Sequence, residues 1–149
     1  MAARLRSCLT ILEPAMVSKQ RLVAAAMKAR LRAVAPYSKF RVGAALLARS
    51  GRIYHGANVE SASYGLTCCA ERIALFAALM KGERDFRALA IVAPMAGGAM
   101  PCGACRQLLA EYAGEAVVFI ADSRRPKVIR GFDVKELLPG AFRMLPGKS

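Results

Sequence analysis

The sequence contains no tryptophan, and only 7% of its 149 residues are aromatic. Proteins that bind single-stranded nucleic acid usually interleave aromatic and basic side chains, so that bases can stack between the charges. This scarcity argues against a nucleic-acid partner, although 23 Lys and Arg against 10 Asp and Glu give a formal charge of +13. The basic residues are scattered along the chain, so we expect them to form a solvated surface.

Long apolar runs are also missing, because no stretch approaches the ~20 residues that span a bilayer. We therefore expect no membrane partner. Residues 1–15 contain a short apolar stretch that Glu13 and Pro14 interrupt, without the cleavage site of a signal peptide. We expect them to be a disordered extension, or to precede a true start at Met16; an organelle transit peptide is less favoured. Residues 16–149 are predicted to form one catalytic domain.

The five cysteines are odd in number and clustered, which is unfavourable for a disulfide framework and favourable for metal binding. Unpaired thiols are typical of the reducing cytosol, so a cytoplasmic location is expected. Cys8 lies in the N-terminal extension and is assigned no role. The single histidine, His55, stands in a predicted strand and is expected at the surface rather than on a metal.

Hydrophobic periodicity predicts alternating helices and strands. Ser18 is a suitable cap for a first helix, which Pro36 would end. Asp133 and Glu136 have the spacing of a capping box for a short last helix. The order predicts an α/β domain in which helices cover a mixed sheet. The elements between these two helices are strands 42–48 and 52–57, helix 69–81, strand 87–93, helix 102–113, and strands 116–121 and 127–130.

Two motifs, Cys69-Ala70-Glu71 and Pro101-Cys102-Gly103-Ala104-Cys105, combine three thiols with one carboxylate. Three protein ligands on zinc leave a fourth position for water, as in catalytic sites, whereas structural sites close with four. The thiols lie at predicted helix starts, where free N–H groups and the helix dipole favour thiolates. Glu71 lies two residues beyond a ligand and could transfer protons without binding the metal.

Other residues near these motifs have less specific predictions. Arg72 and Arg106 each follow a ligand and are expected to donate hydrogen bonds to the sulfurs, which would withdraw charge from the metal. Cys68 is out of register with Glu71 and is predicted to be a small buried apolar residue. The loop at 97–99 is expected to lie outside the catalytic set. Without the upstream Glu71 motif, the C-x-x-C pair would also fit a redox site or half of a zinc ribbon.

The two motifs match the zinc-dependent deaminases, in which three Cys can hold the metal and a Glu is the general acid/base. The chain resembles the small, homotetrameric cytidine deaminases over residues 36–142. Five segments in order carry the resemblance: residues 36–46 (PYSKFRVGAAL), Asn58-Val59-Glu60, residues 67–72, residues 101–107, and Glu136-Leu137-Leu138-Pro139 followed by Phe142.

The resemblance implies a cytidine deaminase-like fold of three layers (α-β-α), with a five-stranded mixed sheet, in a homotetramer with one Zn²⁺ per subunit. It implies hydrolysis of free cytidine and deoxycytidine to uridine, deoxyuridine and ammonia, in pyrimidine salvage. The substrate contacts that it implies are Phe40 and the Ala70 backbone at the base, Asn58 and Glu60 at the ribose, and Phe142 from a neighbouring subunit.

Three alternatives remain at this point. The same chemistry could serve another aminopyrimidine nucleoside such as blasticidin S, although Asn58 and Glu60 favour a ribose. A polynucleotide cytosine deaminase would suit the positive charge, but a site covered by a neighbouring subunit would exclude a strand. A non-enzymatic zinc module would leave Glu71 without a role.

Overall fold

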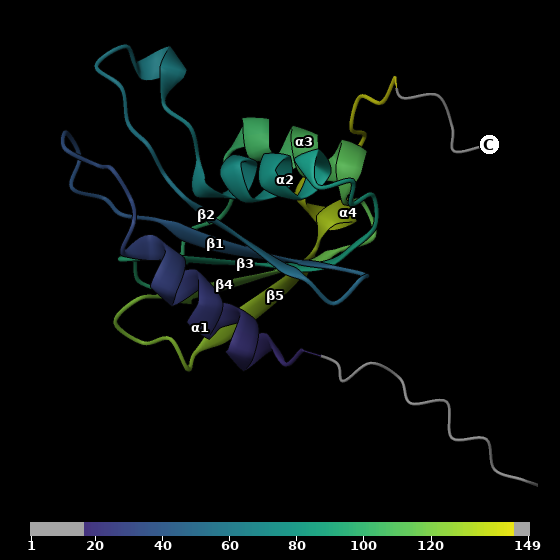
Figure 1. Cartoon of the computed structure of the whole chain (residues 1–149), viewed down its shortest axis with the longest axis horizontal. Coiled ribbons are helices and arrows are strands. Elements are labelled where there is room, and N and C mark those ends of the chain that lie inside the picture. Colours follow the sequence, from purple (N-terminus) through teal and green to yellow (C-terminus); the bar gives the residue numbers. More distant parts are fainter. Residues whose placement is uncertain (1–16, 145–149) are drawn as a thin grey trace, which may run out of the picture.

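A five-stranded sheet lies between two layers of helices in the computed structural model, which describes residues 17–144 (Figure 1). The strand order is β2-β1-β3-β4-β5, with β3 and β4 parallel and the other neighbours antiparallel. The predicted mixed α/β sheet is thus confirmed, whereas residues 1–15 and Cys8 lie outside the described part. The strands are β1 (Gly43–Ala48), β2 (Ile53–Ala57), β3 (Phe86–Ala93), β4 (Val117–Asp122) and β5 (Ile129–Asp133).

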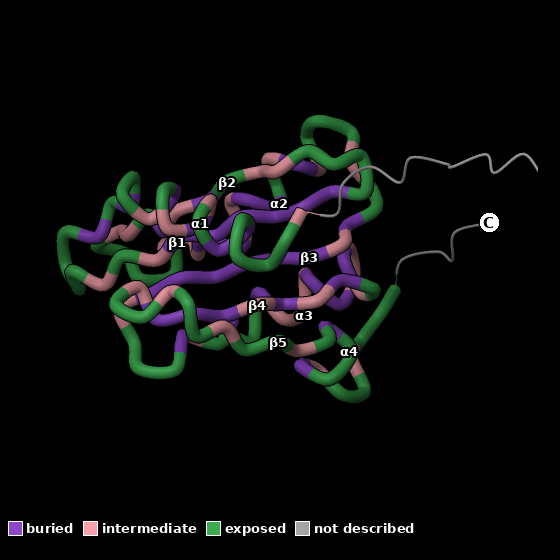
Figure 2. The backbone as a smooth tube through the Cα atoms, turned by 90° about the horizontal axis from the view of Figure 1, so that it is seen from below, coloured by how far each residue is buried: buried purple, intermediate pink, exposed green. Residues whose placement is uncertain are grey.

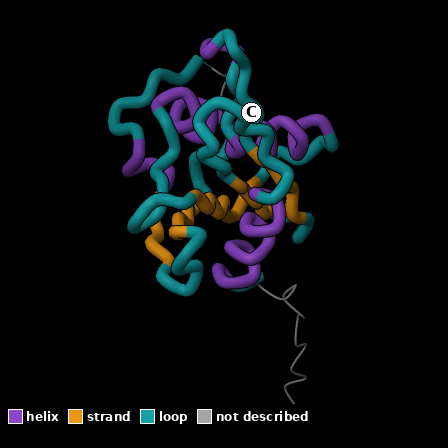
Figure 3. Tube along the Cα trace, turned by 90° about the vertical axis from the view of Figure 1, so that its left-hand side faces the viewer, coloured by secondary structure: helices purple, strands orange, loops and turns teal. Residues whose placement is uncertain are grey.

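Helix α1 (Lys19–Arg30) covers one face of the sheet, and α2 (Ala70–Met80), α3 (Gly103–Tyr112) and α4 (Val134–Leu137) cover the other (Figures 1 and 3). A short 3₁₀ helix, η1 (Tyr64–Leu66), interrupts the loop that leads from β2 to α2. Ser18 caps α1 as predicted, since its Oγ accepts a hydrogen bond from the Arg21 N–H at 3.2 Å.

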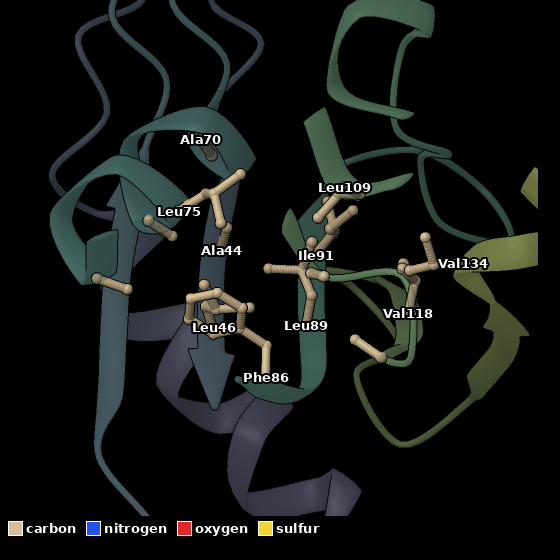
Figure 4. Close-up of a cluster of buried hydrophobic side chains, with 14 of the residues drawn as sticks. Ala44, Leu46, Ala70, Leu75, Phe86, Leu89, Ile91, Leu109, Val118 and Val134 are labelled. Atoms are coloured by element: carbon tan, nitrogen blue, oxygen red, sulfur yellow. The ribbon is translucent and has the colours of Figure 1, made fainter. Parts of the chain in front are cut away.

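The core consists of two apolar clusters, one on each face of the sheet. On the α1 face, Leu22 and Val23 pack against the small side chains of β1 and β3. On the other face, Leu75 of α2 and Leu109 of α3 meet Ile91 of β3 (Figure 4). The central strands are buried while β5 is largely exposed (Figure 2). Each fully buried Leu or Ile contributes about 1.5–3 kcal/mol, so α2 and α3 are held firmly on the sheet.

Helix α1 ends at Arg30, earlier than the predicted boundary at Pro36. The reason is a tertiary contact: the Val34 N–H donates to the Asn58 carbonyl at 2.9 Å, and the Glu60 N–H donates to the Val34 carbonyl at 2.8 Å. The chain therefore makes a turn at residues 31 and 32 and enters a β-bridge at Val34, in line with the restriction that Pro36 imposes on the residue before it. This pairing brings residues 34–40 beside the segment that follows β2.

The boundaries near the C-terminus also differ from the prediction. Strand β5 runs from Ile129 to Asp133, later than the predicted 127–130, because it pairs along β4 up to Val117. The predicted capping box of Asp133 and Glu136 is present and begins α4. In it, the Asp133 N–H donates to Glu136 Oε2 at 3.2 Å.

Candidate active site

The two cysteine motifs meet where α2 and α3 begin on the same face of the sheet. Cys69 is the N-terminal cap residue of α2, Cys102 is that of α3, and Cys105 lies in the first turn of α3. Their Sγ atoms all lie within 4.8 Å of one another. Residues 33 positions apart in the sequence thus form one cluster of three thiols, as the motifs predicted.

The geometry of the cluster fits a zinc ion. Zinc binds thiolate sulfur at ~2.3 Å in tetrahedral sites, which places two sulfur ligands about 3.8 Å apart. The Sγ atoms of Cys69 and Cys102 are 3.8 Å apart. The three residues could therefore hold the metal at three corners of a tetrahedron. Cys105 is buried while Cys102 is exposed, so the cluster lies at the boundary between the core and the surface.

The cluster favours the thiolate at Cys69. A hydrogen bond from Cys105, together with one from Arg72, lowers the pKa of the Cys69 thiol to about 5. The same hydrogen bond to Cys69, reinforced by burial, raises the pKa of Cys105. Zinc binding would require all three thiols to be deprotonated, so metal affinity would depend on pH.

Glu71 lies in the first turn of α2 and is 7% exposed. Burial, and to a smaller extent the negative charge of Cys69, raises the pKa of the Glu71 carboxyl to about 7. Its carboxylate is not part of the group of possible metal ligands. Glu71 thus has the position expected of a general acid/base beside a metal site. Its pKa of about 7 lets it both accept and release a proton near neutral pH.

A pocket of about 220 Å³ opens onto Glu71, Cys69 and Cys102. Six residues predicted for the site line it: Phe40, Asn58, Cys69, Ala70, Glu71 and Cys102. The other lining residues, which the sequence reasoning missed, are Val42, Thr67, Ile91, Ala99 and Met100. Ala99, at the end of the 97–99 loop, thus lines the pocket although the loop was expected to lie outside the catalytic set. The sequence held a signal for this, because Ala99 and Met100 directly precede the Pro101-Cys102 motif.

Comparisons with known proteins show the family of this chain. Residues 16–121 match the family model described as the cytidine and deoxycytidylate deaminase zinc-binding region. The chain belongs to the cytidine and deoxycytidylate deaminase family. It is 50% identical over 124 residues to the cytidine deaminase of Sporosarcina psychrophila, which covers 83% of this chain and 90% of that relative.

Solved structures of deaminases share this fold. A cytidine deaminase from Burkholderia pseudomallei superposes with a TM-score of 0.80 at 45% identity, covering 84% of this chain and 99% of the other. A blasticidin-S deaminase of Bacillus cereus is more distant, at 30% identity over 110 residues and 68% of this chain. In the described part of the chain, no helix is long and apolar enough to cross a membrane.

The deaminase pocket borders a second hollow of about 410 Å³, which contains Glu60. The two share Thr67 as a lining residue. Glu60 accepts hydrogen bonds from the Tyr37 N–H at 2.9 Å, the Ser38 N–H at 3.2 Å and the Ser38 hydroxyl. These bonds, with the Ser38 hydroxyl the strongest cause, hold the pKa of Glu60 below its usual value. Glu60 is therefore an ionised acceptor at the rim of the pocket.

Asn58 is 8% exposed, and both ends of its amide are engaged. Its Oδ1 accepts from the Val42 N–H at 2.8 Å, and its Nδ2 donates to the Phe40 carbonyl at 2.9 Å. Asn58 thus pins the segment that carries Phe40 to the wall of the pocket. The free lone pair of Oδ1 remains available to a ligand.

The two arginines that follow ligands have different positions. Arg72 Nη2 lies 3.7 Å from Cys69 Sγ and donates to the Thr67 carbonyl at 2.9 Å. Arg106 instead donates to two carbonyls, those of Pro101 at 2.8 Å and Leu137 at 3.0 Å. The predicted contact between arginine and sulfur is therefore present for Arg72, whereas Arg106 joins the metal loop to the end of α4.

Phe142 does not line the pocket of its own chain, and its side chain is 69% exposed. Cys68 is half-buried beside Cys69 but is not part of the metal cluster. His55 lies exposed on the edge strand β2, as predicted. None of these three residues lines the pocket of its own chain.

Proposed function

We propose that this chain hydrolyses free cytidine and deoxycytidine to uridine and deoxyuridine, with release of ammonia, in pyrimidine salvage. The observation that carries the proposal is the buried Glu71 carboxyl beside three clustered thiols at one pocket. Hydrolytic deamination needs an activated water and one group that moves protons between water, ring nitrogen and amine. The three thiols are suited to hold a metal that would activate the water, and Glu71 is suited to move the protons.

Cys69, Cys102 and Cys105 would hold one zinc ion per subunit, which would supply Lewis-acid activation of a water molecule and lower its pKa towards ~7. Glu71 takes a proton from the water while the water oxygen attacks C4 of the ring. Glu71 then delivers that proton to N3. It then takes the remaining proton of the new hydroxyl and passes it to the 4-amino group. The C4–N bond breaks, ammonia leaves, and C4 keeps the oxygen as a carbonyl.

The substrate is proposed to occupy both hollows, with the base in the inner pocket and the ribose at its rim. Phe40 would pack against the base, and the backbone of Ala70 would meet its polar edge. The ribose hydroxyls would donate to Glu60, replacing its bond from the Ser38 hydroxyl, and to the free lone pair of Asn58. Two acceptors from one extended segment suit a diol and favour a ribose over other substituents.

We further propose that the enzyme is a cytoplasmic homotetramer and that it does not act on polynucleotides. Three reduced thiols as ligands are compatible with a reducing compartment. In a single chain, Cys102 and Met100 at the pocket remain exposed, so a cover is needed to exclude bulk water. Phe142 of a neighbouring subunit is the proposed cover, and it would leave no room for a nucleic-acid strand.

A comparison of substrates tests this proposal. Zinc-loaded protein is incubated separately with cytidine, deoxycytidine, blasticidin S and a single-stranded oligocytidine, and deamination is followed by ultraviolet absorbance or mass. We expect turnover of the two nucleosides only, with a Glu60→Gln variant raising KM for cytidine more than it lowers kcat. Preferential turnover of blasticidin S or of the oligonucleotide would contradict the assignment.

A further inference from the structure

Two consecutive residues of α3 bind the C-terminal segment of the chain directly after the ligand Cys105. Arg106 bridges the Pro101 carbonyl, at 2.8 Å, and the Leu137 carbonyl, at 3.0 Å. The Gln107 side-chain amide donates to the Phe142 carbonyl at 2.7 Å and to Glu111 Oε1 at 2.6 Å. Residues 138–144, which follow Leu137, are called the C-terminal arm. The metal-binding helix thus holds the chain at Leu137, directly before the arm, and at Phe142 within it.

The arm residue after Phe142, Arg143, lies among charged side chains. It lines a hollow of about 320 Å³ whose other charged residues are Arg49, Arg84, Asp85, Glu111 and Glu115. Its guanidinium helps to lower the pKa of Glu115, after the larger effect of Lys135. Glu111 orients the Gln107 amide from one turn further along α3, and it lines the same hollow as Arg143 of the arm. The arm follows α3 and passes close to α4 (Figure 1).

Although Gln107 holds its backbone at Phe142, the arm leaves two apolar residues exposed. Phe142 is 69% exposed and Met144 is 78% exposed, and neither lines the pocket of this chain. An exposed aromatic residue on a segment whose backbone is held by Gln107 at Phe142, and by Arg106 just before it at Leu137, is not explained by the stability of one chain. Such a ring is explained if a second copy receives it, because the deaminase pocket lacks a cover in a single chain.

We propose that Gln107, supported by Arg106 and Glu111, is a positioning residue that holds Phe142 in place to cover the active site of a second copy of this chain. The inference rests on the proposed deaminase activity and on the proposed assembly. It adds to both that the residues which position Phe142 over one active site lie on the metal-binding helix α3 of another subunit. Arg106 and Gln107, which directly follow the ligand Cys105, thereby link the metal site of one subunit to the substrate site of its neighbour.

Hybrid oligomers test which chain needs Gln107. Chains with Glu71→Gln and chains with Phe142→Ala are co-expressed with different tags, and hybrids are isolated by two affinity steps. In a hybrid, an intact Glu71 on one chain can be covered by an intact Phe142 on the other, so we expect a KM for cytidine near that of the wild type. Adding Gln107→Leu to the Glu71→Gln chain should raise KM about tenfold, as for the loss of one hydrogen bond that positions a binding group.

Adding the same Gln107→Leu substitution to the Phe142→Ala chain should leave KM unchanged, because that chain no longer supplies the ring. Equal effects from both chains would overturn the proposal, since a general structural defect would produce them. Failure to isolate any hybrid would also overturn it. The substitution Gln20→Leu, at an exposed position on α1, is the matched control and should change neither KM nor kcat.

Tryptic cleavage after Arg143 gives a second readout that does not depend on activity. We expect Gln107→Leu to release the C-terminal peptide several-fold faster than the wild type or Gln20→Leu, with zinc content unchanged. An unchanged cleavage rate would overturn the proposed positioning role, whatever the enzyme does with cytidine. Absence of turnover in the wild type, with faster cleavage in Gln107→Leu, would instead contradict the proposed function and leave the attachment of the arm intact.

Discussion

Gly56 is the point where β2 touches the beginning of α2, and it offers a sharp test of how the fold holds the site. A Cβ atom at this position would lie 2.0 Å from the Ala70 carbonyl oxygen and 2.7 Å from the Ala74 nitrogen. Real Cβ contacts are essentially never below 3.0 Å. A Gly56→Ala substitution therefore requires the start of α2 to move by about 1 Å relative to β2, because both clashing atoms belong to the helix backbone.

That movement would displace Cys69 and Glu71, which flank Ala70. We expect the free energy of unfolding to fall by about 1–3 kcal/mol, as for other overpacked sites. Since a misplacement of ~1 Å at catalytic groups can cost about 10²-fold in rate, kcat/KM for cytidine should fall by that order. Urea denaturation and the steady-state assay, both on zinc-loaded protein, measure the two effects.

Gly65→Ala is the matched control, because a Cβ at Gly65 would meet no atom within 4 Å. It should keep both stability and activity close to the wild type. The reasoning is refuted if Gly56→Ala behaves like Gly65→Ala, because the close approach of β2 to α2 would then not position the site.

Three further outcomes are expected. Arg72→Ala should lower kcat about 10- to 100-fold through the lost contact with Cys69, with a smaller change in zinc affinity measured by chelator competition; the reverse pattern would contradict its role. Cys105→Ser should yield protein without stoichiometric zinc by metal analysis, whereas Cys68→Ser should retain it. The hydrogen bond from Arg124 holds the pKa of Asp122 below its ordinary 3.8. The ionised Asp122 therefore stabilises the fold above about pH 4, and this contribution is lost as the pH falls further. The free energy of unfolding should fall less on acidification in Asp122→Asn than in the wild type, and equal falls would refute this.

Local sequence signals predicted most of the architecture. Ser18 and the pair of Asp133 and Glu136 are capping residues, and the structure confirms both helix starts. The end of α1 could not be predicted, because it depends on the pairing of Val34 with residues 58 and 60, which lie far away in the sequence. For the same reason β5 continues past its predicted end, since its partner strand β4 sets its length.

The metal cluster was predictable because its three ligands and Glu71 lie in two compact motifs. The hydrogen bonds of Asn58 and Glu60 within their own chain were not, because they join segments whose proximity only the folded chain creates. The partner of Arg106 could not be predicted for the same reason. Its sequence neighbour Cys105 suggested a hydrogen bond to sulfur, whereas the fold places the Leu137 carbonyl within reach. Sequence motifs therefore predicted the reacting groups better than the groups that position them.

The most direct test of the account compares zinc-loaded wild type with Glu71→Gln, using the loss of cytidine absorbance and the zinc content of the same samples. The account predicts that both proteins hold one zinc per chain and that kcat falls by about 10²–10⁴-fold in the variant, the usual contribution of a general acid/base. A Glu71→Gln variant that holds zinc and turns over cytidine at a rate near that of the wild type would contradict the central role of Glu71. So would a zinc-loaded wild type that leaves cytidine unchanged.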